Sequence, residues 1–309
     1  MKAVHCLGVA VMDALSGPID RYPEPRRRPQ VNTETVRLQP GGGAVNTACA
    51  LARMGLPAAL FARVGCDLLG DALLEGLRQE GVDVSGVYRA EGDTTPFTFV
   101  GVHPGGERTF IHTPGANLSL CPDDLDINRL VSADFLLYQD LFVLPSLDPR
   151  AGDILAEARR RGAATLLDEC WGLGPDRQTL ERLMPYCDYV MPSLDDMRGL
   201  YPGAEPCEIA ARLHEAGAGT VVVKMGADGC LVSVGGECVQ VGALPACVVD
   251  ATGAGDCWNA GFIAGLMQDL DAFAATDLGC ACAAFCIEAV GGAVGVPPLA
   301  EVLERARRR

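Results

Sequence analysis

The sequence predicts a three-layer α/β/α fold with a mostly parallel central sheet. Short apolar runs alternate with helix-like segments along the whole chain, which is the pattern of consecutive βα units. The chain of 309 residues is long enough for one large α/β domain, and its 49% hydrophobic and 21% charged residues are typical of a globular protein. Because no repeat, low-complexity tract or linker divides the chain, we expect a single domain over residues 1–309.

Apolar periodicity places the elements of the N-terminal half. Ala3–Val11 is predicted to be a buried strand because it is almost continuously apolar. Asn46–Met54 repeats small and apolar residues at helical spacing, which predicts a helix, and the apolar run Ala58–Val64 predicts the next strand. A second helix is expected over Leu68–Glu80, with Asp67 placed to cap it.

The alternation of strands and helices resumes in the C-terminal half. Two helices, about Cys257–Met267 and Asp271–Ala289, are expected to close the chain. The strands and helices expected before them are Phe135–Tyr138, Asp153–Arg161, Ala164–Asp168, Tyr189–Met191, Glu208–Ala216 and Val221–Lys224.

Two stretches interrupt this alternation and predict a small second sheet. Thr33–Leu38 alternates in polarity, which indicates a half-exposed strand. Phe97–Val102 and Arg108–Thr113 flank Pro104-Gly105-Gly106, which predicts a β-hairpin. We expect these inserted strands, from about residues 14–39 and 84–115, to form a small antiparallel lid beside the main domain.

Charge and hydropathy argue against several classes of partner. The net charge of −15 makes the average surface repel nucleic acids and anionic lipids, and the three arginine runs at 26–28, 159–161 and 307–309 are short and scattered. No apolar stretch reaches the ~18–20 residues that a membrane-spanning helix needs. The N-terminus also lacks the pattern of a signal peptide. We therefore expect neither a nucleic-acid nor a membrane partner.

The fourteen cysteines indicate a compartment rather than a metal site. No Cys-x-x-Cys pair is present, and only four histidines accompany the cysteines, so the spacing does not predict zinc. Cys280, Cys282 and Cys286 lie among apolar residues, where cysteine behaves as a small hydrophobe. Many thiols without a secretion signal indicate a reducing compartment, so we expect a cytoplasmic protein.

The segment Asp-Ala-Thr-Gly-Ala-Gly-Asp at 250–256 carries the strongest functional signal. Gly253 and Gly255 allow successive N–H groups to point into one concavity at a helix N-terminus, where an anion is favoured. Asp256 lies at the mouth of this concavity, where it could accept a proton from a hydroxyl that attacks a phosphate. On shape alone, a glycine-rich turn with an aspartate capping the helix explains the segment equally well.

The segment Pro-Gly-Gly-Gly-Ala-Val-Asn at 40–46 is the second signal. Its glycines let a ligand approach the backbone, and the amide of Asn46 could both donate to and accept from a polyol hydroxyl. The segment does not fit G-x-x-x-x-G-K-[ST], because no Lys-Ser/Thr pair follows, nor G-x-G-x-x-G, because position 46 is Asn. These mismatches argue against a P-loop NTPase and a Rossmann dinucleotide site.

Together the two segments resemble the two signatures of the ribokinase-like (phosphofructokinase-B type) carbohydrate kinases, and the resemblance covers essentially the whole chain. Val4–Asp13 is similar to the family's first strand, which ends in a substrate-binding aspartate. Residues 222–229 are similar to its nucleotide-side Gly-x-x-Gly turn, and residues 289–293 to the segment near its adenine and monovalent-cation sites. The resemblance implies a kinase that uses ATP and Mg²⁺.

The resemblance also implies a role for each matching residue. Asp256 would be the general base on the acceptor hydroxyl. Asp250 lies where some members coordinate a monovalent cation, which would be K⁺, although a carboxylate that caps the loop explains it equally well. The implied binding residues are Gly253, Ala254 and Gly255 for a backbone anion hole, Asp13, Gly42 and Asn46 for the acceptor's hydroxyls, and Lys224, Gly226 and Gly229 for the nucleotide.

Two segments depart from the family pattern. Where the family usually has Asn-x-x-Glu near the phosphates and Mg²⁺, this chain has Ser193 and Asp196. These side chains could replace the usual groups through water, because Mg²⁺ keeps several waters in most sites. The family's Asp-x-Asn-x-Arg stretch is Asp168-Glu169-Cys170-Trp171-Gly172 here and retains only the first carboxylate. We expect Asp196 to contact the metal through water.

The expected function is transfer of the ATP γ-phosphoryl group to a hydroxymethyl of a small, ribose- or fructose-like sugar. A nucleoside kinase is an alternative, and its acceptor would need an aromatic slot. Phe97, Phe99 or Phe110 could furnish that slot, or could simply form the core of the hairpin. A sensor that binds sugar or nucleotide without turnover is an alternative of another class. The altered 193–196 segment favours a sensor, and Asp256 argues against it.

The inserted strands also predict assembly. They are too small and too sparsely apolar to form a core of their own, and they leave open sheet edges that a soluble protein must cover. Two copies packed across a twofold axis would cover those edges. The resemblance implies the same, because many family members dimerise through such a lid. We expect a homodimer.

Overall fold

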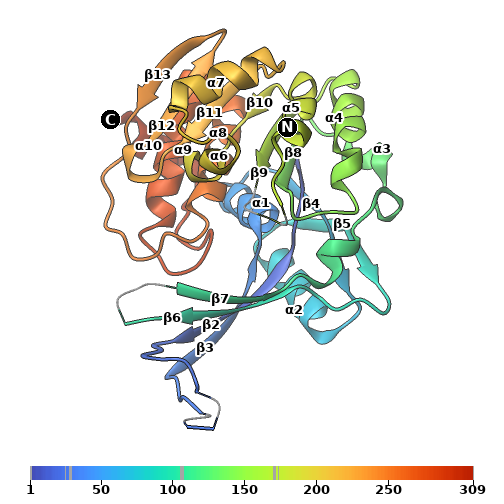
Figure 1. Cartoon of the computed structure of the whole chain (residues 1–309), viewed down its shortest axis with the longest axis vertical. Coiled ribbons are helices and arrows are strands. Elements are labelled where there is room, and N and C mark those ends of the chain that lie inside the picture. Colours follow the sequence, from blue (N-terminus) through green and yellow to red (C-terminus); the bar gives the residue numbers. More distant parts are fainter. Residues whose placement is uncertain are drawn as a thin grey trace.

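The computed structural model describes residues 2–24, 26–27, 30–104, 108–169, 172 and 174–308. They form a three-layer α/β/α body from which a small second sheet projects (Figure 1), as predicted. None of the described helices is both long and apolar enough to cross a membrane. Some residues named above lie outside the described residues: Arg28, Gly105, Gly106, Cys170, Trp171 and Arg309.

Nine strands of the described residues form the large sheet, and most of them are parallel. The exceptions among the described strands lie at one edge, where β12 pairs in an antiparallel manner with both β11 and β13. The order across the sheet is β13 (Glu237–Val241), β12 (Cys230–Val234), β11 (Thr220–Lys224), β10 (Tyr189–Val190), β9 (Ala164–Glu169), β8 (Phe135–Leu141), β1 (Val4–Leu7), β4 (Ala58–Gly65) and β5 (Asp83–Ala90).

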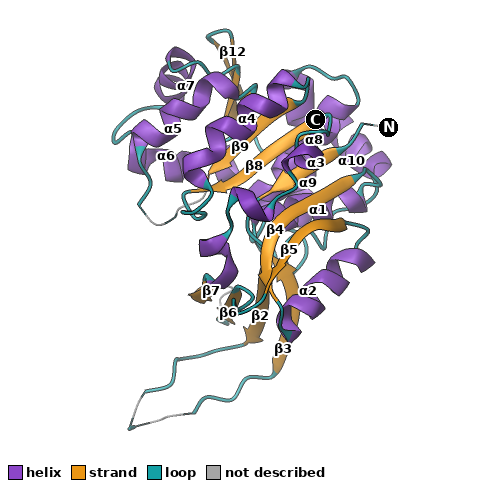
Figure 2. Cartoon of the chain, turned by 90° about the vertical axis from the view of Figure 1, so that its right-hand side faces the viewer, coloured by secondary structure: helices purple, strands orange, loops and turns teal. Residues whose placement is uncertain are grey.

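Helices cover both faces of the large sheet (Figure 2) because the side chains of its strands alternate between two apolar cores. In β4, for example, Leu60 and Ala62 enter one core and Phe61 enters the other. The first core packs against α1 (Gly43–Arg53), α2 (Leu68–Gln79), α8 (Ala254–Met267), α9 (Ala272–Cys286) and α10 (Leu299–Arg307), and the second against α3 (Ile127–Leu130), α4 (Ala151–Arg160), α5 (Arg177–Leu183), α6 (Leu194–Leu200) and α7 (Pro206–Glu215).

Several local predictions are confirmed, and one is wrong. Asp67 caps α2, because its carboxylate accepts the N–H of Gly70 at 2.8 Å. Cys280, Cys282 and Cys286 are buried in α9. The expectation that two helices close the chain is wrong, because α10 follows them and buries Val302. Short 3₁₀ helices lie at Gly115–Ser119, Pro122–Asp124, Asp148–Arg150, Met184–Tyr186 and Gly226–Asp228.

The predicted first strand is in fact two strands that belong to different sheets. Val4–Leu7 is β1 of the large sheet, and β2 (Val11–Gly17) belongs to the small sheet. Between them the N–H of Val9 donates to the Asp140 carboxylate at 3.0 Å rather than to a neighbouring strand. The ladder of the large sheet therefore ends there, and the chain passes into the small sheet.

The small sheet, which we call the lid, has the order β3 (Thr35–Gly41), β2, β6 (Phe97–Val102) and β7 (Arg108–Thr113). The predicted hairpin of β6 and β7 is confirmed. The expectation of an all-antiparallel lid is wrong, because β2 and β6 are parallel. The chain returns through β4, α2 and β5 before it re-enters the lid, and this path gives β6 the direction of β2. The second lid insert was expected to span about residues 84–115. This start is wrong, because β5 (Asp83–Ala90) belongs to the large sheet and the first lid strand of the insert is β6.

The two faces of the lid differ. Strand register places Leu38, Ala14, Phe99 and Ile111 in one row, and Gln39, Asp13, Thr98 and His112 in the next row on the opposite face. We call the face with Asp13 the inner face. Alternation along β7 places His112, Phe110 and Arg108 together on it, and the face with Leu38 and Ile111 is the outer face.

Candidate active site

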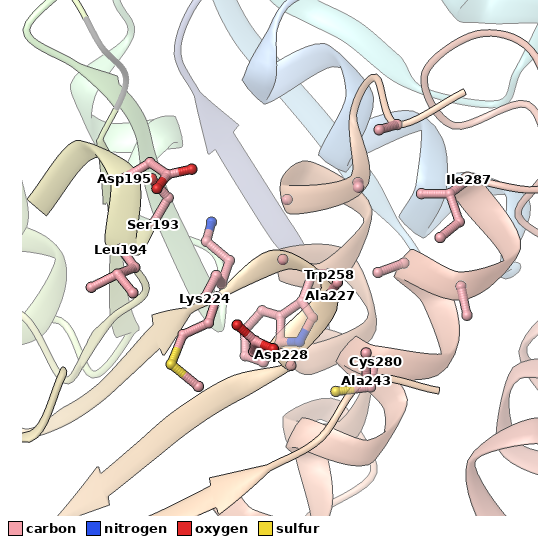
Figure 3. Close-up of a pocket in the computed structure, with 18 of the residues that line it drawn as sticks. Ser193, Leu194, Asp195, Lys224, Ala227, Asp228, Ala243, Trp258, Cys280 and Ile287 are labelled. Atoms are coloured by element: carbon pink, nitrogen blue, oxygen red, sulfur yellow. The ribbon is translucent and has the colours of Figure 1, made fainter. Parts of the chain in front are cut away.

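A cavity of about 910 Å³ opens at the carboxyl edge of the large sheet, beside α6 and α8. Ser193 and Lys224 come from one side of it and Ile287 from the opposite side (Figure 3). One part of its lining is polar and the other is apolar. The polar residues include Asp168, Glu169, Ser193, Asp196, Lys224 and Asp256, and the apolar ones include Leu244, Val248, Trp258, Ala283 and Ile287.

The structure brings most of the predicted site residues together. Those that line this cavity are Lys224, Gly226 and Gly229, predicted for the nucleotide, Ala254 and Gly255, predicted for the anion hole, and Asp196 and Asp256. The three residues predicted for the acceptor, Asp13, Gly42 and Asn46, do not line it. Asn46 nevertheless contacts Asp256, so Asp256 lies at the boundary between the cavity and the predicted acceptor residues.

Asp256 lies in the first turn of α8, directly after the glycine-rich turn. Gly253 caps this helix with a φ of 75°, a conformation that favours glycine. Two side-chain amides donate to the carboxylate, that of Asn46 at 2.8 Å and that of Gln139 at 2.8 Å. Burial raises the pKa of Asp256 to about 7 and the carboxylate of Asp168 adds to this, while the two amides and Lys224 oppose it. The carboxyl can therefore exchange a proton near neutral pH.

Of the three backbone N–H groups predicted for the anion hole, at Gly253, Ala254 and Gly255, at least one is already used within the turn. The N–H of Ala254 donates to the carbonyl of Ala251 at 3.3 Å, which closes the turn before α8. Gly253 packs closely on the backbone of another loop, since a Cβ there would lie 3.0 Å from the Cα of Gly292. The glycine at this position thus also allows two loops to meet at the start of α8.

The glycine turn at the start of α1 is shaped by contacts within the protein. Gly42 has a φ of 104°, and a Cβ on it would lie 2.6 Å from the carbonyl oxygen of Val9. A Cβ on Gly43 would lie 2.2 Å from the Asp140 carboxylate. The glycines therefore let the N-terminus of α1 approach the end of β8, which brings Asn46 to Asp256.

Sequence reasoning missed Gln139 and Asp140 at the carboxyl end of β8. Asp140 is buried and accepts the N–H groups of Val9 at 3.0 Å and Ala44 at 3.1 Å. Burial, and then repulsion from Asp256, raise the pKa of Asp140 to about 7. The available signal was a pair of polar residues after a buried parallel strand, which is where α/β proteins place ligand-binding groups.

Lys224 ends β11 and holds a buried polar network together. Its ammonium donates to Asp168 at 2.9 Å and to the side-chain oxygen of Asn259 at 3.2 Å, and the Asn259 amide donates to Asp168 at 2.5 Å. Burial alone would lower the pKa of Lys224, but the carboxylates of Asp168 and Glu169 outweigh this and raise it. The network fixes the lysine at the wall of the cavity.

Glu169 is a second residue that sequence reasoning left without a role. The N–H of Ser193 donates to one of its carboxylate oxygens at 3.1 Å, and the other oxygen is buried without a partner among the described residues. Burial, followed by repulsion from Asp168, raises the pKa of Glu169 well above its usual range. Both effects favour the protonated form of Glu169.

Asp196 and Ser193 form the start of α6. The Ser193 hydroxyl lies 2.6 Å from the Asp196 carboxylate and accepts the N–H of Asp196 at 3.0 Å. Burial raises the pKa of Asp196. In the part of the chain that the structure describes, no three His, Cys, Asp or Glu side chains are grouped so that they could hold a metal ion by themselves. A divalent ion here would depend on a substrate's oxygens and on water, as Mg²⁺ commonly does.

Asp250, the candidate for a monovalent cation, is already engaged on both oxygens. One oxygen accepts the N–H of Thr252 at 2.9 Å, and the other accepts the N–H of Gly291 at 2.7 Å and forms an ion pair with Arg108. The guanidinium supplies the positive charge that a cation would supply. The carboxylate therefore does not fit a monovalent-cation site.

Asp13 lies on the inner face of the lid, close to the end of β3. A Cβ on Gly41 would lie 2.1 Å from its carboxylate, so the glycine makes room for it. Burial raises the pKa of Asp13 to about 6, although the Thr98 hydroxyl and the charge of Arg108 oppose this. The lid thus presents a carboxylate that can accept hydrogen bonds.

Comparison with known proteins identifies the family. The sequence profile of the pfkB family carbohydrate kinases matches residues 4–298. An uncharacterized sugar kinase of Archaeoglobus fulgidus is 31% identical over 80% of this chain and 98% of its own length. A 2-dehydro-3-deoxygluconokinase of Thermoproteus tenax is 32% identical over 85% of this chain and 84% of its own. The structure of Arabidopsis thaliana ribokinase with ribose and ATP superposes with a TM-score of 0.87 over 99% of both chains, at 24% identity.

This chain belongs to the pfkB family of carbohydrate kinases, and it has the ribokinase-like fold. It is an ATP-dependent carbohydrate kinase.

Proposed function

We propose that the enzyme transfers the γ-phosphoryl group of ATP to a hydroxymethyl group of a small, ribose- or fructose-like sugar, with Asp256 as the general base. The observation that carries the proposal is the position of Asp256. Its carboxylate has a pKa of about 7 and lies at the edge of a nucleotide-sized cavity. It also contacts Asn46, one of the residues proposed to bind the acceptor, at 2.8 Å.

In this mechanism the adenine occupies the apolar part of the cavity, and the phosphates lie beside Lys224 and the turn at Gly255. Asp13, Gly42 and Asn46 hold the acceptor so that its hydroxymethyl oxygen faces Asp256. The carboxylate accepts the hydroxyl proton as the oxygen bonds to the γ-phosphorus and the bond to the β,γ-bridging oxygen breaks, releasing ADP. Mg²⁺ bound to the nucleotide would neutralise charge on the phosphates, and Asp196 would hold it through water.

Removing the Asp196 carboxylate tests the proposed contact with the metal. In Asp196→Asn we expect the Mg²⁺ concentration for half-maximal activity to rise several-fold, while turnover at saturating Mg²⁺ changes less, because a water-mediated contact contributes affinity rather than chemistry. A Mg²⁺ titration of initial rates measures both quantities, and Mn²⁺ binding followed by electron paramagnetic resonance measures affinity without turnover. An unchanged titration would remove Asp196 from the metal site.

The pH dependence of the reaction tests the electrostatics of the base. The charged groups that face Asp256 are the carboxyls of Asp140 and Asp168 and the ammonium of Lys224. Because the base must be ionised, wild-type kcat/KM is expected to fall as the pH drops through about 7. Asp140→Asn removes a negative neighbour and should lower the pKa of Asp256, so the acidic limb should move down by on the order of one pH unit. A limb that stays in place or moves up would contradict this coupling.

A nucleoside is the second candidate acceptor, and Phe110 favours it. Phe110 shares the inner face of the lid with Asp13, and its side chain is 57% exposed. An exposed aromatic ring on that face could stack on a nucleobase. Phe97 is partly buried against the main core instead, which is neither an open slot nor a core of the hairpin itself. The alternative of a non-catalytic sensor is set aside, because the chain belongs to a family of kinases.

A turnover screen with MgATP distinguishes the acceptors. The panel would contain pentoses, hexoses, sugar acids and nucleosides, with ADP release as the signal and ATP hydrolysis without acceptor as the blank. The proposal expects the highest kcat/KM on a neutral pentose or ketohexose. A nucleoside preference that falls in Phe110→Ala would favour the second candidate, and a sugar-acid preference would overturn both.

We also propose a homodimer that forms through the outer face of the lid. Val36, Leu38 and Ile111 are each more than half exposed there, at 65%, 53% and 59%. Apolar side chains gathered on one sheet face are a common feature of interfaces. Light scattering is expected to give twice the chain mass, and Leu38→Glu together with Ile111→Glu should give a monomer. A wild-type monomer with full activity would refute the dimer. The cytoplasmic location of the protein is not tested by this experiment and stays a prediction.

A further inference from the structure

Arg108 connects the lid to the loop that carries the proposed catalytic base. It begins β7 on the inner face of the lid, and its side chain is only 12% exposed. One nitrogen of the guanidinium forms an ion pair with Asp250, and another donates to the Thr252 hydroxyl at 2.7 Å. The lid therefore contacts the 250–256 segment through a charged group that is almost removed from water.

Asp250 organises the start of α8. Its side chain is 2% exposed, and its oxygens accept the N–H groups of Thr252 and Gly291, which belong to two different loops. Gly253 packs against the second of these loops, next to Gly291. The position of the glycine turn that leads to Asp256 thus depends on the Asp250 carboxylate.

A carboxylate this deeply buried needs a positive partner, because an unpaired buried charge costs several kcal/mol. Among the ion pairs of the described residues, Arg108 is the one cation that pairs with Asp250. A guanidinium suits this place because its planar fork can reach the carboxylate and a neighbouring hydroxyl at once. The charge comes from the lid, however, so it is supplied only while the lid lies against the body.

We propose that Arg108 is a positioning residue that provides, from the lid, the fixed positive charge that Asp250 needs, so that the 250–256 turn reaches its active geometry when the lid is closed. The inference rests on the proposed role of this turn in phosphoryl transfer. It follows that the enzyme needs no monovalent cation at Asp250. The loss of Arg108 should lower kcat more than it weakens ATP binding, because Arg108 does not line the nucleotide cavity.

The first test measures initial rates in potassium chloride and in choline chloride at equal ionic strength. Wild type is expected to show the same kcat in both salts. Arg108→Met should lose about 100-fold in kcat, since one partner of a buried ion pair has been removed, and K⁺ or guanidinium ions should restore part of it. Arg89→Met is the matched control, because Arg89 pairs with Asp71 at an exposed site and should retain wild-type kcat.

The second test is a double-mutant cycle that needs no acceptor. Arg108→Met should lower the unfolding temperature, and Asp250→Asn in the same chain should recover part of the loss, because the orphaned charge is then removed. Arg108→Lys keeps the positive charge but lacks the planar fork of the guanidinium, so it should give an intermediate kcat. It replaces Arg108→Met in both tests if Arg108→Met does not fold.

The outcomes separate the inference from the proposed function. If wild type phosphorylates no acceptor, the proposed function fails, and the unfolding cycle still reports whether Arg108 and Asp250 are coupled. Activation of wild type by K⁺, a kcat near wild type in Arg108→Met, or strictly additive effects in the cycle would each overturn the inference.

Discussion

Replacing Asp256 with asparagine is expected to remove most turnover and to leave nucleotide binding intact. Asparagine has the shape of aspartate and one acceptor oxygen, but it cannot take the proton of the attacking hydroxyl. General-base catalysis contributes about 10²–10⁴-fold, so kcat should fall by that factor. Steady-state kinetics measures the loss, and calorimetry with ATP measures binding.

The Asp256→Asn experiment needs a control for the loss of one negative charge. Asp153→Asn is suitable, because Asp153 lies on α4 and its side chain is 69% exposed. That variant should have wild-type kcat. A kcat of more than about a tenth of wild type in Asp256→Asn would mean that another group is the base.

Lys224→Met is expected to destabilise the fold and to weaken ATP binding together. The ammonium is the cationic partner of Asp168, and both side chains are largely buried, at 12% and 6% exposure. Removing one partner of a buried pair typically costs about 3–5 kcal/mol. The same substitution removes a positive charge from the wall of the cavity that is proposed to hold the phosphates. Urea unfolding and ATP calorimetry measure the two effects.

The double variant Lys224→Met with Asp168→Asn separates these effects. Asp168→Asn removes the carboxylate that Lys224→Met leaves without a cationic partner, so much of the lost stability should return. ATP affinity should stay low, because the cavity still lacks its lysine. A stability loss below about 1 kcal/mol in Lys224→Met, or no recovery in the double variant, would show that the pair is not a principal contributor to stability.

The two glycine-rich segments could be predicted because their signal is local. Gly42 and Gly253 adopt positive φ values, at 104° and 75°, and such positions are marked in the sequence by glycine itself. The hydrogen bond between Asn46 and Asp256 joins these segments across the chain. The sequence indicated both residues, but only the tertiary structure shows that they touch.

Gln139, Asp140 and Glu169 were missed in the sequence for a different reason. The polar residues at 139 and 140 suggested the end of a strand, although β8 continues to Leu141. Their importance comes from burial and from neighbours distant in the sequence, such as Asp256 for Gln139 and Ser193 for Glu169. No local pattern records which polar residues a fold will bury.

The three-layer order of the fold could be predicted from the sequence, because the spacing of apolar residues indicates whether a strand or helix is buried on one face or on both. The division of the first strand was not, because apolar residues continue from β1 into β2 although the sheet changes. The parallel pairing of β2 with β6 was equally hidden, since it follows from the path of the chain through β4, α2 and β5.

The transfer of the chain between sheets after Leu7 has an evolutionary consequence. On the proposed assignment, Asp13 contacts the acceptor from the lid, whereas Asp256 and the nucleotide cavity belong to the body. Mutations in four lid strands can then change the preferred sugar while selection preserves the chemistry of ATP. Grafting these strands from a relative with a different acceptor would be a direct route to new specificity, provided that the graft retains the arginine at 108.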